Sequence, residues 1–325
     1  MEQDFGLTDL FDQSPKHVDL CAGTGAFTLV MEEELGARCV FANDNCKKSK
    51  QIYDDNFSQQ MTFGDLNEID LDDIPECDIL TAGFPCNPWS MKGLRKGFED
   101  SRSEVFFTLV AILKKRGPRF AIFENVRGLL SHDKGASFKK MIDVIEKVGY
   151  VVKWTMVNTD VHTSIPQNRE RVFIFCFKNA SDAKKVDLHI DHVEESQHFM
   201  KFTEETVDEK YYMDRSVRFE TFSAGITEHR NLYQWRRKEV VKIKPGKCPC
   251  LLAAMGTGGL NVPMFRTSEN RIRKLTPREC FNLQGFPEYY KLPKHVPMTA
   301  LYKLAGNAVT IEIVRLLVRK LGSLV

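Results

Sequence analysis

The sequence lacks a hydrophobic run long enough to cross a membrane, and it has no recognisable signal peptide. Its 9 cysteines form neither a CxxC pair nor the regular spacing of a disulfide framework. Cys248 and Cys250 lie two residues apart, but no histidine or cysteine cluster stands nearby to complete a zinc site. We therefore expect an intracellular protein with reduced thiols, no metal and no membrane contact, in the cytoplasm or nucleoid of a bacterium or the nucleus of a eukaryote.

A strong overall charge is also missing, because the formal net charge is only +2 over 325 residues. The charges are unevenly placed. Residues 1–80 carry 18 acidic against 5 basic side chains, whereas residues 230–278 carry 12 basic against 2 acidic. Such a local basic excess predicts a surface that meets phosphate groups, although a solvated face explains it equally well.

Short apolar runs alternate with helix-like segments between residue 16 and about residue 178. The expected strands are His17–Leu20, Cys39–Ala42, Ile79–Ala82, Phe120–Phe123, Val151–Val157 and Arg171–Phe177. Val105–Lys115 and Phe138–Val148 have the apolar spacing of helices and end at Gly117 and Gly149. The alternation predicts an α/β fold with a doubly wound, mostly parallel sheet, whose ligands bind beyond the carboxyl ends of the strands.

The pattern divides the chain into three parts. Residues 1–178 form the α/β domain, and residues 179–295, with short polar segments and scattered glycines, form a smaller irregular domain. Residues 296–325 resume a helical pattern from Thr299, and we expect this helix to return and pack on the first domain.

A glycine turn follows the first expected strand, in the run from Val18 to Phe27. Glycines let the backbone approach a ligand closely, and the helix that follows offers free N–H groups. Asp44 ends the second strand, where a carboxylate can bind both ribose hydroxyls, and Asp65 follows the next short run. Because the turn has no lysine to hold phosphates, the pattern disfavours ATP and favours S-adenosylmethionine.

A thiol and a carboxylate each close an apolar run. Cys86 lies in the proline-framed segment Gly83–Pro88, and Glu124 follows about forty residues later. Both can meet at one end of a parallel sheet. There a thiolate can add to an electron-poor ring while the carboxyl group handles the ring's proton.

With four further motifs in order, the chain resembles the cytosine-5 DNA methyltransferase family, most nearly the small bacterial modification methylases. The motifs are the glycine turn, Pro85-Cys86, Glu124-Asn125-Val126, Gln167-Asn168-Arg169-Glu170-Arg171, Arg273–Cys280 and Gly306-Asn307. They cover nearly the whole chain apart from roughly residues 180–245. The resemblance implies a Rossmann-like class I fold, S-adenosylmethionine as methyl donor with S-adenosylhomocysteine as product, and double-stranded DNA as partner.

The resemblance also implies roles for the catalytic residues. Cys86 would add to carbon 6 of a cytosine flipped out of the duplex, and Glu124 would bind the ring N3 and the exocyclic amine. Arg171 would hold the O2 side of the ring, and Arg169 would orient the Cys86 loop and its carboxylate partner. Water or another group would remove the proton from carbon 5.

The remaining site residues follow from the same resemblance. The cofactor-binding set is Asp19, Cys21, Ala22, Gly23, Thr24, Gly25, Phe27, Asp44, Asn45, Asp65, Leu66, Pro85, Val105, Asn307, Ala308 and Val309. The DNA-binding set is Asn87, Lys92, Arg95, Arg236, Arg237, Lys238, Gly256, Gly258 and Gly259. A solvated lysine at position 92, a simple turn at Asn307 and a packing turn at 255–259 are the alternatives.

Four positions depart from the family pattern. Asn87 stands where glutamine is frequent, Cys21 where phenylalanine is common, and Asn45 where a bulky aromatic is frequent. Cys250-Leu251 replaces a Thr-Leu pair in the smaller domain. The departures at Cys21 and Asn45 put the affinity for the adenine ring in question, and the departures at Asn87 and Cys250 put recognition of the target in question.

The sequence favours a monomeric DNA methyltransferase that acts on a short duplex site, with or without a cognate restriction endonuclease. The tRNA branch of the family is an alternative, although its Pro-Pro-Cys-Gln and Cys-Phe-Thr segments are absent here. A catalytically idle DNA-binding regulator is the other alternative. The catalytic set of Cys86, Glu124, Arg169 and Arg171 argues against that regulator.

Overall fold

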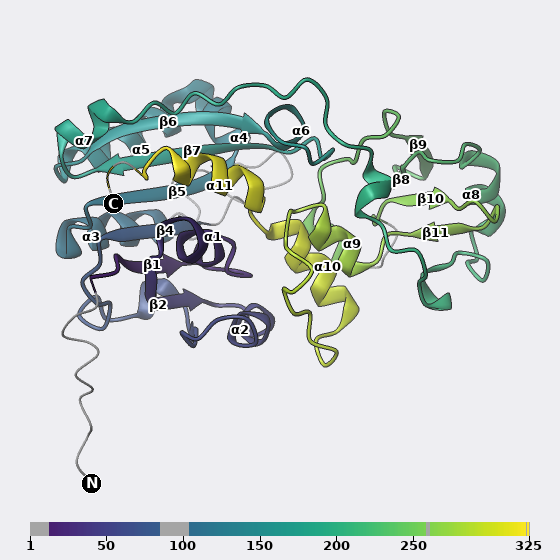
Figure 1. The fold of residues 1–325 in the computed structure, drawn as a ribbon, viewed down its shortest axis with the longest axis horizontal. Helices are drawn as coiled ribbons and strands as arrows, with labels where there is room; N and C mark the ends of the chain where they lie inside the picture. The colour runs from purple at the N-terminus through teal and green to yellow at the C-terminus, as the bar shows by residue number, and fades with distance from the viewer. Residues whose placement is uncertain (1–12, 85–103, 258–260, 323, 325) are drawn as a thin grey trace, which may run out of the picture.

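The computed structural model describes residues 13–84, 104–257, 261–322 and 324. In this part of the chain the larger sheet has seven strands in the order β3-β2-β1-β4-β5-β7-β6 (Figure 1). They are β1 (Lys16–Leu20), β2 (Arg38–Asp44), β3 (Thr62–Phe63), β4 (Ile79–Gly83), β5 (Phe120–Val126), β6 (Val151–Asn158) and β7 (Glu170–Phe177). Only β7 runs antiparallel to its neighbours β5 and β6. The predicted strands and the mostly parallel α/β fold are therefore confirmed.

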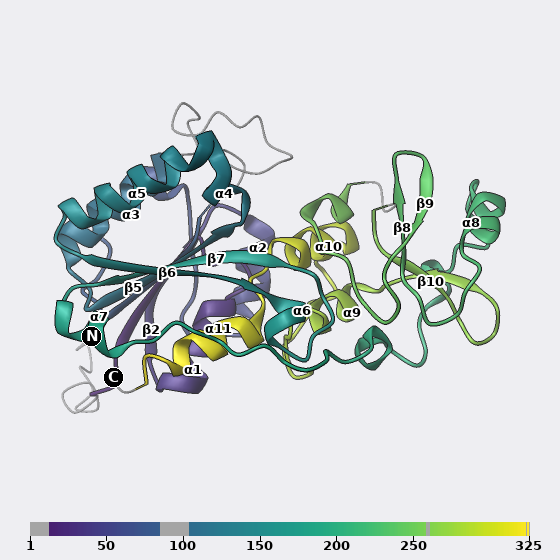
Figure 2. The ribbon, with the colours of Figure 1, turned by 90° about the horizontal axis from the view of Figure 1, so that it is seen from above.

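Helices cover both faces of this sheet (Figure 2). One face carries α3 (Glu104–Arg116) and α5 (Ala136–Lys147), which pack on apolar side chains of β1, β4 and β5. The opposite face carries α1 (Ala26–Leu35), α2 (Lys47–Asp54) and α11 (Ile311–Arg319). Burial on both sides explains why the central strands are nearly continuous apolar runs.

Short helices complete this body. They are α4 (Gly128–Ser131), α6 (Thr159–His162) and α7 (Ala180–Lys185). Gly117 and Gly149 adopt φ values of +59° and +93° directly after the two predicted helices, as the sequence suggests. None of the described helices is both long enough and apolar enough to span a membrane.

A second, antiparallel sheet has the strand order β11-β10-β8-β9. Its strands are β8 (Tyr233–Arg236), β9 (Glu239–Lys242), β10 (Met264–Arg266) and β11 (Ile272–Lys274), and α8 (Phe219–Gly225) lies beside them. A small core of its own holds this body together, formed by Phe222, Ile226, Tyr233, Met264 and Ile272. The strands are so short that the sequence alone does not show them.

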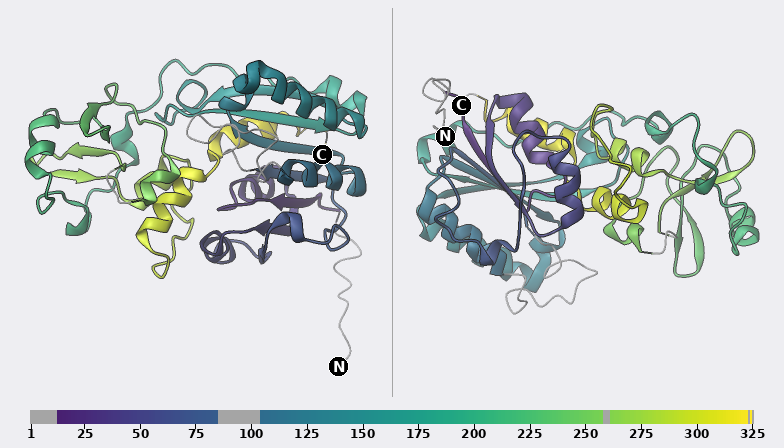
Figure 3. Two further views of the ribbon diagram at one scale, coloured as in Figure 1. Left: turned by 180° about the vertical axis from the view of Figure 1, so that it is seen from behind. Right: turned by 90° about the horizontal axis from the view of Figure 1, so that it is seen from below.

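Helices α9 (Pro277–Asn282) and α10 (Met298–Asn307) and the 3-10 turn η8 (Ala253–Gly256) lie between the two sheets (Figure 3). The single C-terminal helix expected from Thr299 is thus corrected to two helices, because residues 308–310 leave the helical conformation between α10 and α11. Helix α11 returns to α1, where Arg315 and Arg319 form ion pairs with Glu33 and Glu34. The domain boundaries at residues 178 and 295 stay predictions.

Candidate active site

The carboxyl ends of three neighbouring strands meet at Gly83, the last residue of β4. Gly83 pairs with Glu124 of β5 across the sheet. A Cβ atom built on Gly83 would lie 3.9 Å from the Cys21 carbonyl oxygen, from Glu124 Oε2 and from Val309 Cγ2. The structure therefore brings together the glycine turn, the predicted catalytic carboxylate and the 307–309 segment, which lie far apart in the sequence.

The glycine turn is held in a left-handed conformation. Cys21, Gly23 and Gly25 have φ values of +50°, +58° and +73°. The Gly23 N–H donates to Asp44 Oδ2 over 2.9 Å, so the end of β2 fixes the turn after β1. A Cβ on Gly25 would come within 2.2 Å of the Phe57 ring, which leaves room only for glycine.

The turn fits a nucleoside without phosphate groups better than a nucleotide. Burial and the Asp44, Asp19 and Asp65 carboxylates together raise the pKa of the Cys21 thiol, so Cys21 remains a neutral thiol. Such a carboxylate environment repels phosphate groups and suits ribose hydroxyls and a cationic sulfonium. The donor set thus agrees with S-adenosylmethionine.

Asp19 lies inside the sheet rather than at its surface. Its side chain is fully buried, Oδ1 accepts from the Thr81 hydroxyl over 2.8 Å, and Oδ2 accepts from the Thr28 hydroxyl over 2.9 Å. These contacts fix β1 relative to α1 and β4, on either side of the glycine turn. The sequence analysis did not identify Thr28 and Thr81. A direct contact between Asp19 and a cofactor stays a prediction.

The other predicted cofactor residues differ in exposure. Asn45, Asp65 and Asn307 are exposed, whereas Ala22, Thr24, Phe27, Leu66, Val105, Ala308 and Val309 are buried or nearly so. Asp65 caps the turn at residues 66–68 by accepting from the Asn67 N–H. Their contacts with a cofactor stay predictions, and Pro85 lies outside the described residues.

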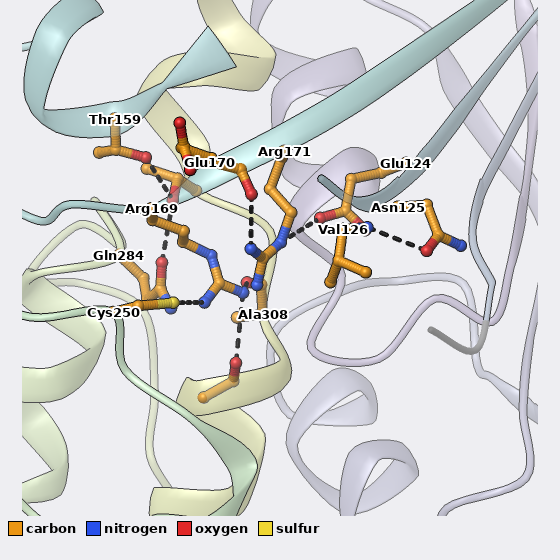
Figure 4. Close-up of polar contacts among 12 residues, drawn as sticks. Glu124, Asn125, Val126, Thr159, Arg169, Glu170, Arg171, Cys250, Gln284 and Ala308 are labelled. Carbon is orange, nitrogen blue, oxygen red and sulfur yellow. Dashed lines mark hydrogen bonds and ion pairs between the residues drawn. The ribbon is translucent and has the colours of Figure 1, made fainter. Parts of the chain in front are cut away.

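Glu124 and Arg171 form an ion pair at the end of the sheet (Figure 4). Arg171 Nε lies 2.9 Å from Glu124 Oε1, and both side chains are largely buried. Asn125 donates to the Phe84 carbonyl over 3.2 Å and so ties β5 to the residue that precedes Pro85. The cation holds the carboxylate in place beside Gly83.

Arg169 lies beside Arg171 but contacts different segments (Figure 4). Its guanidinium donates to the Leu251 carbonyl over 3.0 Å, to the Gly306 carbonyl over 3.2 Å and to the Ala308 carbonyl over 2.6 Å. Burial and the charge of Arg171 lower its pKa to about 10, so it remains charged at neutral pH. The sequence assigned the carboxylate partner to Arg169, but the structure gives the ion pair with Glu124 to Arg171. The orientation of the Cys86 loop by Arg169 stays a prediction, because that loop lies outside the described residues.

Cys250 lies 3.6 Å from Arg169 Nη1. Burial acts to raise the pKa of the Cys250 thiol, but the Arg169 and Arg171 guanidinium groups outweigh it and hold that pKa below its usual value. Gln167 also grips this segment, because its Oε1 accepts from the Leu251 N–H over 3.0 Å. The alternation of charged residues drew attention to Arg169 and Arg171, but no sequence signal shows that Gln167 and Arg169 hold residue 251.

The predicted DNA-contacting residues are only partly described. Arg236, Arg237 and Lys238 are exposed at the tip of the β8–β9 hairpin. Gly256 packs against α10, because a Cβ there would meet the Thr299 carbonyl oxygen at 2.5 Å. This contact agrees with the packing alternative for the glycine-rich run, and a contact between Gly256 and DNA stays a prediction. Cys86, Asn87, Lys92, Arg95, Gly258 and Gly259 lie outside the described residues.

Comparison with known proteins identifies the family. A family model described as C-5 cytosine-specific DNA methylase matches residues 16–323. The chain belongs to the C-5 cytosine-specific DNA methylase family. The predicted class, a DNA (cytosine-5) methyltransferase, is thereby confirmed.

Two relatives match over nearly their whole length. Type II methyltransferase M.Bsp6I of Bacillus sp. (strain RFL6) is 38% identical over 91% of this methylase and 95% of its own chain. Type II methyltransferase M.HhaI of Haemophilus parahaemolyticus is 29% identical over 95% and 94%. The crystal structure of the S. pombe Dnmt2 methyltransferase has 20% identity and a TM-score of 0.73 over 94% of this chain and 98% of that one, which shows the shared fold.

Proposed function

We propose that this methylase transfers a methyl group from S-adenosylmethionine to carbon 5 of a cytosine flipped out of a short duplex DNA site. The Glu124–Arg171 ion pair beside Gly83 carries the proposal. It lies next to the glycine turn and to Val309, so a ring bound at Glu124 would face a cofactor bound at the turn.

Each residue has a chemical task in this reaction. A thiolate at Cys86 forms a bond to carbon 6, which makes carbon 5 nucleophilic, and Glu124 donates a proton at N3. Arg171 holds the carboxyl group and reaches the O2 side of the ring. The cofactor supplies an electrophilic methyl group. A base, with water as a candidate, then removes the carbon 5 proton. The bond between sulfur and carbon 6 breaks and Glu124 takes back the proton from N3, which restores the ring and the Cys86 thiolate.

The duplex is the preferred substrate because of the basic hairpin and because relatives such as M.Bsp6I and M.HhaI are named Type II methyltransferases. Backbone phosphates would bind the basic side chains, and a few base-edge contacts would set the target sequence. A cognate restriction endonuclease, a monomeric state and an intracellular location remain part of the proposal. The tRNA alternative has no specific observation in its favour.

Bisulfite sequencing of a plasmid recovered from cells that express the chain tests the reaction. We expect methylated cytosines in one recurrent short context, and none with Cys86→Ala. Glu124→Gln is expected to lower the rate about 100-fold or more, the range of a lost general acid. Glu170→Gln is the matched control, because Glu170 pairs with Arg127 near the solvent. An unmethylated plasmid from soluble, folded protein would contradict the proposal.

A further inference from the structure

Arg169 joins two segments that belong to opposite sides of the predicted site. Through Leu251 it holds the strand-like segment that leads into η8, and through Gly306 and Ala308 it holds the loop after α10. Its exposed fraction is only 1%. Four N–H donors of the guanidinium are engaged, by the three carbonyls and by the Cys250 sulfur. The loss of any of these bonds would leave a buried polar group unpaired, so the guanidinium fixes the positions of its partners.

The two segments also touch directly, backbone against backbone. A Cβ on Gly306 would lie 2.2 Å from the Leu252 carbonyl carbon and 2.4 Å from the Ala253 nitrogen. Gly256 approaches α10 in the same way at Thr299. Without side chains between them, α10 and residues 252–256 cannot shift independently, because close-packed interiors transmit displacement.

The ends of this packed unit face different ligands in the proposed function. Val309 lies beside Gly83 and the glycine turn, which is the proposed cofactor side. Residues 250–257 follow the basic stretch of the smaller body, which is the proposed DNA side. Arg169 therefore lies where a displacement of the loop on the cofactor side would also displace the segment on the DNA side.

We propose that Arg169 is a positioning residue that couples cofactor binding at 307–309 to DNA binding at 250–257. The coupling rests on the proposed function. A cofactor bound at residues 307–309 restricts the motion of the Gly306 and Ala308 carbonyls. Because Arg169 bonds to these carbonyls and to the Leu251 carbonyl, the motion of Leu251 is restricted as well. By thermodynamic reciprocity, DNA bound to the second segment must raise the affinity for the cofactor by the same factor.

Binding measurements with S-adenosylhomocysteine and a duplex carrying the methylated context test this coupling. The dissociation constant of the duplex is measured with and without the cofactor product, and that of the cofactor product with and without the duplex. We expect a coupling of about fivefold or more in the native chain. Arg169→Lys keeps the charge but loses the planar fork, so the coupling should fall to less than about twofold.

Arg127→Lys is the matched control. Arg127 lies at the same end of the sheet and pairs with Glu170, but it does not bond to either joined segment. We expect it to alter duplex affinity equally with and without the cofactor product, which leaves the ratio intact. Equal coupling in Arg169→Lys and the native chain would overturn the proposal.

Hydrogen exchange of the native chain tests the coupling without a variant, so this test does not depend on whether Arg169→Lys folds. Addition of S-adenosylhomocysteine alone should slow amide exchange at residues 251–257. Unchanged exchange there, with slower exchange at residues 21–25, would overturn the coupling but leave the proposed function intact. No binding of the cofactor product at all would overturn both.

Discussion

At the scale of single residues, Asp19 receives two chains of hydrogen bonds from buried groups. His17 Nε2 lies 2.7 Å from the Thr81 hydroxyl, which donates to Asp19, and the Tyr53 hydroxyl lies 2.9 Å from Thr28 on the other side. Burial raises the pKa of Asp19 to about 7, although the threonine hydroxyls partly oppose this rise. Burial lowers the pKa of His17 to about 3, so the neighbouring imidazole stays neutral when Asp19 titrates.

This burial gives Asp19 a defined contribution to the pH dependence of stability. Because its pKa is higher in the folded chain, the folded state binds the proton more tightly between pH 4 and 7. The contribution of Asp19 to the free energy of unfolding is therefore present at low pH and is lost as pH rises toward 7, by at most about 1.4 kcal/mol per pH unit.

Asp19→Asn should remove this dependence. The difference in the free energy of unfolding between the native chain and the variant, measured by urea denaturation, should fall as pH rises from 4 to 7. Other carboxylates also change the free energy of unfolding in acid, when they lose their ion pairs. Because they do so equally in the native chain and in the variant, their contributions cancel in the difference. A difference that is constant over this range would contradict the burial of a titrating carboxyl group at position 19.

The meeting of Glu124 with the arginines of the 167–171 motif was predictable at this scale, but its pairing with Arg171 rather than Arg169 and the surroundings of Arg169 were not. Glu124 and Arg171 each sit at the end of an apolar run, and the register of β5 and β7 places such ends together. The carbonyl partners of Arg169 come from segments 82 to 139 residues away. No local pattern encodes which backbone carbonyl a buried guanidinium will find.

At the scale of the element, the glycine turn combines two constraints that substitutions can separate. Gly25 has both a positive φ and the Phe57 ring at its missing Cβ, whereas Gly36 has a φ of +59° and open space. A side chain at position 25 would therefore clash with the Phe57 ring and strain the left-handed backbone, whereas a side chain at position 36 would only strain the backbone.

Gly25→Ala should lower the free energy of unfolding by more than Gly36→Ala, which should lose about 1 kcal/mol. Only Gly25→Ala should weaken binding of S-adenosylhomocysteine, because only that turn faces the proposed cofactor. Thermal unfolding and calorimetric titration of both variants measure the two effects. Equal losses of cofactor affinity would contradict the placement of the cofactor at this turn.

The β8–β9 hairpin ends in a two-residue turn made of basic residues. Arg236 pairs with Glu239, and Arg237 and Lys238 between them have φ values of +49° and +69°. Such turns favour Asn-Gly, because left-handed backbone is unfavourable for long side chains. Strain of this kind is expected where exposed side chains have a function.

Replacing Arg237-Lys238 with Asn-Gly should therefore stabilise the protein by about 1 kcal/mol or more and weaken duplex binding. The logarithmic salt dependence of binding should become shallower by about 2. Removing the charges of Lys184 and Lys185 on α7 is the control, since α7 lies at the far end of the molecule (Figure 1). An unchanged salt dependence in the hairpin variant would argue against phosphate contacts there.

Element length decided which parts of the fold were predictable. Strands of five to eight residues, such as β1 and β7, appear as apolar runs. Strands of two to four residues, such as β3 and β10, fall below that signal. The split between α10 and α11 escaped prediction because Ala308 and Val309 are apolar and continue the pattern while the backbone turns.

At the scale of the whole molecule, the last helix completes the first core. Five apolar residues of α11 are buried among side chains that include those of α1: Ile311, Ile313, Val314, Leu317 and Val318. Tyr290 extends the same core, since its hydroxyl donates to the Thr24 carbonyl over 2.6 Å. The larger sheet is thus covered by residues from both ends of the sequence.

A fragment that ends at residue 190 should therefore not fold cooperatively. We expect it to bind hydrophobic dyes and to lack a sharp urea transition, because one face of its sheet is uncovered. The chain of residues 1–325 with Arg315→Gln and Arg319→Gln is the control, and it should still unfold cooperatively, since ion pairs are lost while the buried apolar side chains of α11 remain. A sharp transition in the fragment would show that the first 190 residues are self-sufficient.

Because α11 covers one face of the larger sheet, the order of synthesis affects when this core can form. A ribosome releases α1 well before α11, so the nascent chain must hold an open, apolar sheet face while the residues between the two helices are synthesised. The methylase can become active only after α11 has left the ribosome. During that interval the growing polypeptide depends on chaperones or on rapid elongation to avoid aggregation.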